Sequence, residues 1–175
     1  MSKSASTSFI FANCKGAITT TINQIRRISN VETVTPVTGR FDLVIKLRTN
    51  EPTKAFNVLE RIRGIKNITN TQTALSFQSI SSGTSRASEE DEQPLAFALV
   101  KVKGAFQNVL RRIKSFPNFL EAHVIPGEFD VVAAFKGYSH EELLENSVEK
   151  LNTINGITSS ETLIAWNPTN ATSTY

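Results

Sequence analysis

The chain contains one unit of sequence twice, with equivalent residues 88 positions apart. Gly39-Arg40-Phe41-Asp42 recurs as Gly127-Glu128-Phe129-Asp130, and upstream Cys14-Lys15-Gly16-Ala17 recurs as Val102-Lys103-Gly104-Ala105. The chain has only three aspartates, and Asp42 and Asp130 hold equivalent positions in the two units. A duplicated unit with a duplicated glycine–carboxylate turn favours a paired binding scaffold over an enzyme with one asymmetric active site.

Each repeat predicts the order strand, helix, strand, strand, helix, strand, which is a ferredoxin-like unit of the α+β class. The first helix has apolar residues at steps of three and four, and they recur 88 residues later: Ile18, Ile22, Ile25 and Ile28, then Phe106, Leu110, Ile113 and Phe116. The second helix shows Phe56, Leu59 and Ile62, then Val148, Leu151 and Ile154. That offset of 92 predicts four extra residues in repeat two, near Gly137 to Glu142.

The strands are apolar on both faces, as in Leu43-Val44-Ile45 and Val131-Val132-Ala133-Ala134-Phe135. A strand with one face in water should instead alternate apolar and polar residues. Because helices cover only one face of a ferredoxin-like sheet, we expect the two antiparallel sheets to pack face to face as an intramolecular pseudo-dimer.

The chain divides into five segments. We expect a first domain over residues 8–77 and a second over 95–166, joined by a flexible linker over 78–94 that is Ser-rich and then acidic. Residues 1–7 and 167–175 are polar and predict disordered tails.

Composition excludes several classes of protein. There is no apolar run long enough for a membrane span and no signal sequence, and the single cysteine, Cys14, fits a reducing cytoplasm. The net charge of +3 comes from scattered basic residues, so we expect no direct nucleic-acid binding. The two histidines have no metal-ligand spacing, and no phosphate loop or Ser-His-Asp set occurs, so we expect no metal and no cofactor.

The order of elements and turns resembles the effector-binding domain of the leucine-responsive regulator (Lrp/AsnC) family, also called the RAM domain. Repeat two carries Gly127-Glu128-Phe129-Asp130, Gly156-Ile157 and Thr162, and repeat one carries Gly39-Arg40-Phe41-Asp42 and Gly64-Ile65. Family members usually begin with a helix-turn-helix DNA-binding domain, and only about eight residues precede the first strand here. Repeat one also differs at Arg40, where an acidic residue is common, and has no Thr at the spacing of Gly156 to Thr162.

The resemblance implies binding of free amino acids near the Gly-x-Phe-Asp turn, at interfaces between dimers. The expected ligand-binding residues are Gly127, Glu128, Phe129, Asp130 and Thr162 in repeat two, and Gly39, Arg40, Phe41 and Asp42 in repeat one. An aspartate can accept a charge-assisted bond from an ammonium group, and backbone N–H groups at the glycine can hold a carboxylate. Alternatively, each aspartate only caps its own turn. Arg40 can favour a carboxylate or phosphate, or pair at the rim with Glu128.

These features predict a non-enzymatic, effector-binding regulatory protein of the cytoplasm. We expect its pseudo-dimers to self-associate and to bind members of the same family that carry helix-turn-helix domains. One alternative is a purely oligomerising protein without a ligand. Another is a ferredoxin-like dimeric enzyme, which the strands filled with Phe, Leu, Ile and Val disfavour. Because repeat two keeps the family pattern more closely, we expect it to be the better effector site.

Overall fold

The computed structural model describes residues 4–82 and 95–167. They form two compact units. Unit 1 holds the residues up to Ser76 together with Trp166, and unit 2 spans Phe77–Ala165. Each unit is an antiparallel sheet with helices along one face, so the predicted α+β class with two ferredoxin-like repeats is confirmed. Within these described ranges, no helix is both long and apolar enough to cross a membrane.

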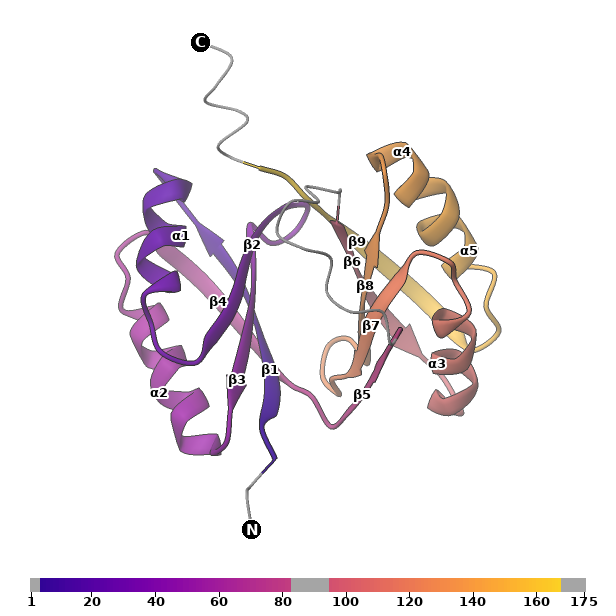
Figure 1. Cartoon of the computed structure of the whole chain (residues 1–175), viewed down its shortest axis with the longest axis horizontal. Coiled ribbons are helices and arrows are strands. Elements are labelled where there is room, and N and C mark those ends of the chain that lie inside the picture. The colour runs from indigo at the N-terminus through magenta and orange to yellow at the C-terminus, as the bar shows by residue number, and fades with distance from the viewer. Residues whose placement is uncertain (1–3, 83–94, 168–175) are drawn as a thin grey trace. The chain divides into compact units, whose positions relative to one another are not determined.

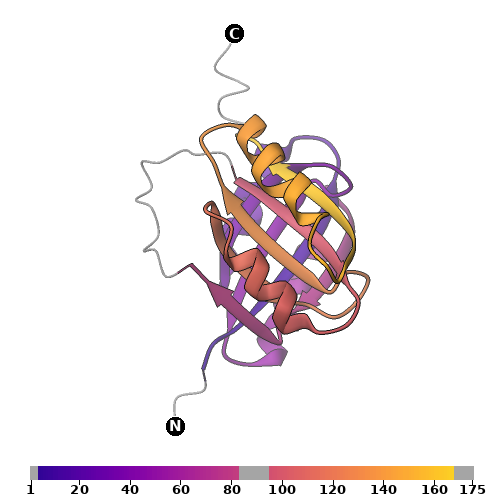
Figure 2. The same ribbon diagram turned by 90° about the vertical axis from the view of Figure 1, so that its right-hand side faces the viewer.

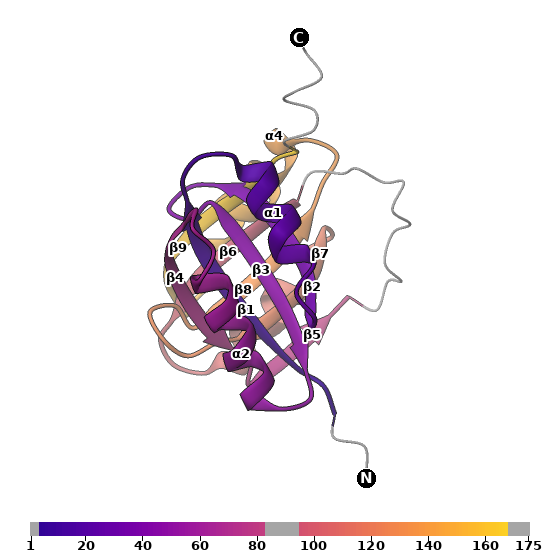
Figure 3. The same ribbon diagram turned by 90° about the vertical axis from the view of Figure 1, so that its left-hand side faces the viewer.

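Unit 1 has the strand order β4-β1-β3-β2. Helices α1 and α2 lie across one face of this sheet (Figures 1 and 3). Their buried stripes, which include Ile25 and Ile62, pack on Ile10 and Ile45 of the sheet. The elements are β1 (Ser6–Cys14), α1 (Ile18–Arg26), β2 (Val31–Thr38), β3 (Leu43–Thr49), α2 (Pro52–Arg63) and β4 (Ile68–Leu75).

Unit 2 repeats this arrangement in the order β9-β6-β8-β7 and adds β5 beside β7 (Figure 2). Its core contains Ile113 and Leu151 from the helices and Ala98 and Phe135 from the sheet. The elements are β5 (Gln78–Ser81), β6 (Leu95–Val102), α3 (Phe106–Lys114), β7 (Phe119–Val124), β8 (Val131–Lys136), α4 (His140–Leu143), the π-helical turn η1 (Leu144–Val148), α5 (Glu149–Leu151) and β9 (Ile157–Ala165).

Strand β5 differs from the linker predicted from residue 78 onwards. Its four residues pair with β7, and the flanking Phe77 and Ser82 N–H groups donate to the carbonyls of Val124 and Leu120. The apolar side chain of Ile80 packs on the core of unit 2. The Ser-rich composition suggested a linker, but β7 offers an unpaired edge that these backbone groups satisfy. The remaining predicted linker, residues 83–94, lies outside the described residues.

The predicted four-residue insertion near Gly137 to Glu142 is wrong. Helices α2 and α4 begin 88 residues apart, at Pro52 and His140, so the offset has not changed there. Beyond the helix the offset between equivalent residues is 89. Lys15 and Lys103 are equivalent, and their N–H groups donate to Asn67 O and Gly156 O, so Asn67 and Gly156 are equivalent as well. Repeat two therefore has one extra residue, and the π-helical turn Leu144–Val148 absorbs it.

Both sheet faces are buried, as the apolar strands require. Ile10 and Leu43 face the helices, whereas Phe9, Phe11 and Val44 point to the opposite face and are at most 2% exposed. In unit 2, Leu99 and Val132 likewise point away from the helices and are at most 1% exposed. The face-to-face packing of the two sheets stays a prediction.

Candidate functional site

The two Gly-x-Phe-Asp turns have the same geometry. Asp42 N–H donates to Ala12 O and Asp130 N–H to Val100 O, each at 2.9 Å. The Asp42 Oδ2 atom accepts from Cys14 N–H at 3.0 Å, and the Asp130 Oδ2 atom accepts from Val102 N–H at 2.9 Å. Each carboxylate thus fastens the turn to the end of the first strand of its repeat, 28 residues earlier, instead of capping its own turn.

The neighbours of Asp42 are specific to repeat one. The Asn13 side-chain amide donates to Arg40 O at 2.9 Å and lies 3.5 Å from Asp42 Oδ2. Burial and the negative charge of Asp42 together raise the pKa of the Cys14 thiol. A thiol with a raised pKa is mostly protonated at neutral pH, so Cys14 is a poor nucleophile.

The other turn residues divide into core and surface. Phe41 and Phe129 are buried, and the Phe41 ring packs 5.4 Å from the ring of Phe11. Arg40 and Glu128 are exposed, with the Arg40 guanidinium 5.0 Å from the centre of the Phe41 ring. The two phenylalanines therefore anchor the turn in the core, while the residues that differ between repeats face solvent.

The two turn glycines are not equivalent. Gly39 has φ of 131°, a conformation that favours glycine, whereas Gly127 does not adopt a positive φ. A Cβ atom at Gly127 would meet nothing closer than Ile125 O at 3.7 Å, which is ordinary contact. The backbone freedom expected of glycine in this turn is therefore used only in repeat one.

Thr162 does not lie beside the Asp130 turn. It pairs with Ala98, whose side chain belongs to the helix-covered core, so Thr162 faces the helices as well. Asp130 instead bonds Val102, four residues and about 13 Å further along β6. Thr73, which pairs with Ile10, is the counterpart of Thr162 in repeat one. The predicted lack of a matching Thr in repeat one is therefore wrong.

A cleft that the sequence did not predict lies in unit 2, at the end of β8 opposite the turn. Its volume is about 570 Å³, and the lining comprises Ser82, Lys114, Phe116, Pro117, Asn118, Phe119, Leu120, Lys136, Gly137, Tyr138 and Glu142. The Asn118 amide donates to Ser147 Oγ at 2.8 Å, and Glu142 Oε2 accepts from Tyr138 N–H at 2.8 Å. Asp130 and Lys136 are six residues apart along the chain at β8, or about 20 Å.

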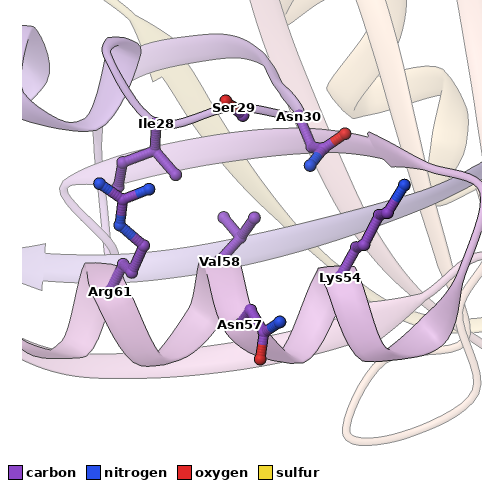
Figure 4. Close-up of a pocket in the computed structure, with 7 residues that line it drawn as sticks. All are labelled: Ile28, Ser29, Asn30, Lys54, Asn57, Val58 and Arg61. Atoms are coloured by element: carbon purple, nitrogen blue, oxygen red, sulfur yellow. The ribbon is translucent and has the colours of Figure 1, made fainter.

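Unit 1 has a smaller cleft of about 170 Å³ at the equivalent place, lined by Ile28, Ser29, Asn30, Lys54, Asn57, Val58 and Arg61 (Figure 4). Asn30 and Asn118 correspond, because their carbonyls accept from Arg48 N–H and Lys136 N–H at 2.9 Å. The recurrence of this asparagine 88 residues apart was the available sequence signal, and it resembles the recurrence of the aspartate.

The comparisons with known proteins identify the family. The model for the Lrp/AsnC ligand binding domain matches residues 7–85 and again residues 95–174, and the chain therefore belongs to this family. The predicted two tandem copies are confirmed. No curated protein matches the sequence.

Solved structures show how widely the two-repeat fold occurs. The siroheme decarboxylase NirDL is 12% identical with a TM-score of 0.69, and the match covers 93% of this chain and 72% of NirDL. Chlorite dismutase from Candidatus Nitrospira defluvii, in complex with imidazole, is 8% identical with a TM-score of 0.61, covering 97% of this chain and 94% of the dismutase. At these identities the likeness shows the fold alone.

These structures contradict the expectation that the chain is not an enzyme. That expectation rested on strands filled with apolar side chains, and by their names the decarboxylase and the dismutase are enzymes of the same two-repeat fold. Apolar strands in this fold are thus compatible with catalysis. The family match, in turn, supports effector binding of a regulatory type.

Proposed function

We propose that the protein binds a small-molecule effector, an amino acid or a similar metabolite, and that this binding regulates transcription together with other members of its family. The observation that carries the proposal is the double match to a ligand-binding domain, which spans nearly the whole chain. Partners with helix-turn-helix domains, self-association and a cytoplasmic location belong to the same proposal.

The proposed effector site is the Gly-x-Phe-Asp turn, chiefly Gly127, Glu128 and Asp130 of repeat two. Asp130 uses Oδ2 for the Val102 backbone, which leaves Oδ1 to accept from a ligand ammonium group. Glu128 adds a second, exposed carboxylate, where repeat one has the cation Arg40. A ligand ammonium group is attracted by Glu128 and repelled by Arg40, which supports the preference for repeat two.

The test is a thermal-shift and calorimetric screen of the proteinogenic amino acids. A ligand at 100 times its dissociation constant stabilises the folded protein by about 2.7 kcal/mol. Asp130→Asn and Asp42→Asn are the matched variants, and we expect only Asp130→Asn to weaken binding strongly. Equal losses in the two variants would contradict the preference for repeat two. No stabilisation by any amino acid would contradict the amino-acid effector.

The screen should also contain an iron tetrapyrrole, because NirDL has been solved in a co-complex with an iron-uroporphyrin III analogue. Binding of a tetrapyrrole changes its visible absorption band, so this arm has its own readout. If neither amino acids nor the tetrapyrrole bind, a purely oligomerising role becomes the better proposal.

A further inference from the structure

The cleft of unit 2 is built differently from its counterpart in unit 1. With the offset of 89 after the extra residue, Ser147 occupies the place of Val58, a residue that lines the smaller cleft. Ser147 is 1% exposed, yet it is polar, and it binds the Asn118 amide at the wall of the larger cleft. The π-helical turn and a buried polar pair thus accompany the larger volume.

Asn118 retains an unused acceptor. Its Oδ1 atom is buried and has no hydrogen-bond partner among the described residues. Leaving a buried acceptor unpaired costs about 1–3 kcal/mol. Unit 1 forms the same fold without a buried Asn–Ser pair, so the fold alone does not explain this cost.

Two cations flank the same space. Within the described residues, neither the Lys114 nor the Lys136 ammonium group makes a hydrogen bond or an ion pair. The one carboxylate in the lining, Glu142, is held at the start of α4, where its Oε2 accepts from Tyr138 N–H. The lining therefore carries a net positive charge.

The cleft of unit 1 shows the same property with different residues. Lys54 and Arg61 extend from α2 on either side of Val58, toward the segment of Ile28, Ser29 and Asn30 (Figure 4). Lys114 and Lys136 instead come from the end of α3 and the end of β8. Because the cations stand at different positions in the two repeats, the shared feature is the charge of the cleft rather than an inherited residue.

The remaining lining is apolar. Phe116 packs on the core with its ring 5.9 Å from the ring of Phe135, and Pro117 and Leu120 continue this wall. Tyr138, which is 82% exposed, stands at the edge. A volume of about 570 Å³ lies in the range of small-molecule sites, which combine apolar walls with a few polar groups.

We propose that this cleft binds a small organic anion, a carboxylate or a phosphate monoester, that has an aromatic body. Lys114 and Lys136 attract the anion, and Phe116 and Pro117 contact the aromatic body. The site goes beyond the proposed effector function, since it lies at the opposite end of β8 from Asp130.

Calorimetry and protein-observed NMR on the full chain test the proposal with matched probes. Indole-3-acetate and AMP distinguish the carboxylate from the phosphate. Tryptamine and adenosine keep the rings without the anion. We expect at least one of the two anions to bind with a dissociation constant of about 1 mM or lower, and the probe without its anion to bind about tenfold more weakly.

The variants locate the binding. Lys114→Gln combined with Lys136→Gln should weaken the anion about tenfold or more. Arg48→Gln, at the equivalent strand position of repeat one, should leave it unchanged. The proposal is overturned if neither anion saturates the protein at about 10 mM, if tryptamine or adenosine binds equally well, or if Arg48→Gln weakens binding as much as the double variant.

Asp130→Asn separates this site from the proposed effector site. We expect it to leave anion binding in the cleft unchanged while it weakens the amino-acid effector. The double lysine variant should do the reverse. Loss of anion binding in Asp130→Asn contradicts a separate cleft site, whatever the amino-acid screen shows.

Discussion

Replacing Asp130 by alanine tests whether this carboxylate stabilises the fold. The change removes the bond from Val102 N–H to Asp130 Oδ2, which is 2.9 Å long. A hydrogen bond to a charged group contributes about 1.5–3 kcal/mol. Because Asp130 is only half-buried, we expect the free energy of unfolding to fall by an amount near the lower end of that range, about 1.5 kcal/mol. For a unit of this size, each kcal/mol lost lowers the melting temperature by roughly 4–8 °C.

The matched change is Asp42→Ala, which removes the equivalent bond from Cys14 N–H at 3.0 Å. We expect a loss of similar size, because its further neighbour, the Asn13 amide, lies at the limiting distance of 3.5 Å. Both asparagine variants keep an acceptor oxygen and should lose less than the alanine variants. Urea denaturation followed by circular dichroism, with linear extrapolation, measures the free energy of unfolding.

A loss below about 0.5 kcal/mol in both alanine variants would refute this reasoning, since that is the range of ordinary surface substitutions. The carboxylates would then contribute nothing to the strand ends, and ligand binding would be the better account of their recurrence. If Asp130→Ala lowers the free energy of unfolding but leaves effector binding intact, the aspartate serves only the stability of the turn.

Four further changes have expected outcomes. Gly156→Ala should destabilise by at least about 1–2 kcal/mol in urea denaturation, because Gly156 has φ of 103° and a Cβ would lie 3.1 Å from Val109 Cγ2, whereas Gly127→Ala should be nearly neutral. Deleting Glu145, one residue of the π-helical turn, should leave the circular dichroism of the fold intact, because repeat one forms a continuous α2 with one residue fewer; a chain that unfolds contradicts this. The folded pKa of Cys14 is raised above its ordinary value of 9.0, so its contribution to stability is complete below pH 9.0 and is lost as the pH rises through the folded pKa; Cys14→Val should remove this part of the alkaline loss in melting temperature. The fragment Leu95–Trp166 should dimerise or aggregate in analytical ultracentrifugation, because Leu99 and Val132 form an apolar sheet face, and a stable, well-ordered monomer would contradict the pseudo-dimer.

Hydrophobic periodicity predicted the fold class and the order of elements, because each strand and helix buries a regular set of side chains. The same periodicity misplaced the second helix of repeat two. A slip of four residues along an α-helix returns to almost the same face, so the offsets of 88 and 92 give equally apolar stripes. The Gly64-Ile65 and Gly156-Ile157 pairs then favoured the wrong offset, whereas the backbone bonds of Asn67 and Gly156 show the actual one.

The candidate sites differ in how far the sequence could predict them. The recurring Asp42 and Asp130 were visible as a motif, and their placement at equivalent turns follows from the repeat. Their bonds to Cys14 and Val102 depend on where the first strand ends, which no local pattern specifies. The cleft of unit 2 combines residues from the end of α3, from β7, from the end of β8 and from the start of α4, which lie far apart in the sequence and form no local pattern.

Two substitutions between the repeats have opposite physical characters. In repeat one the Asn67 amide donates to Thr21 Oγ1, and repeat two has Gly156 and Val109 at the same places, so a satisfied polar pair has become apolar packing.

The change at the cleft goes the other way. Val58 is replaced by buried Ser147, and the Asn118 amide that binds it keeps an unpaired oxygen. The first exchange replaces both partners of a hydrogen bond by apolar groups, which leaves no unpaired polar atom behind and can be nearly neutral. The second adds buried polar atoms without completing their hydrogen bonds, which lowers stability unless a ligand or water satisfies them. The cleft is therefore one place where the two repeats differ in a way that the fold does not require, and there we expect the function of repeat two to have diverged.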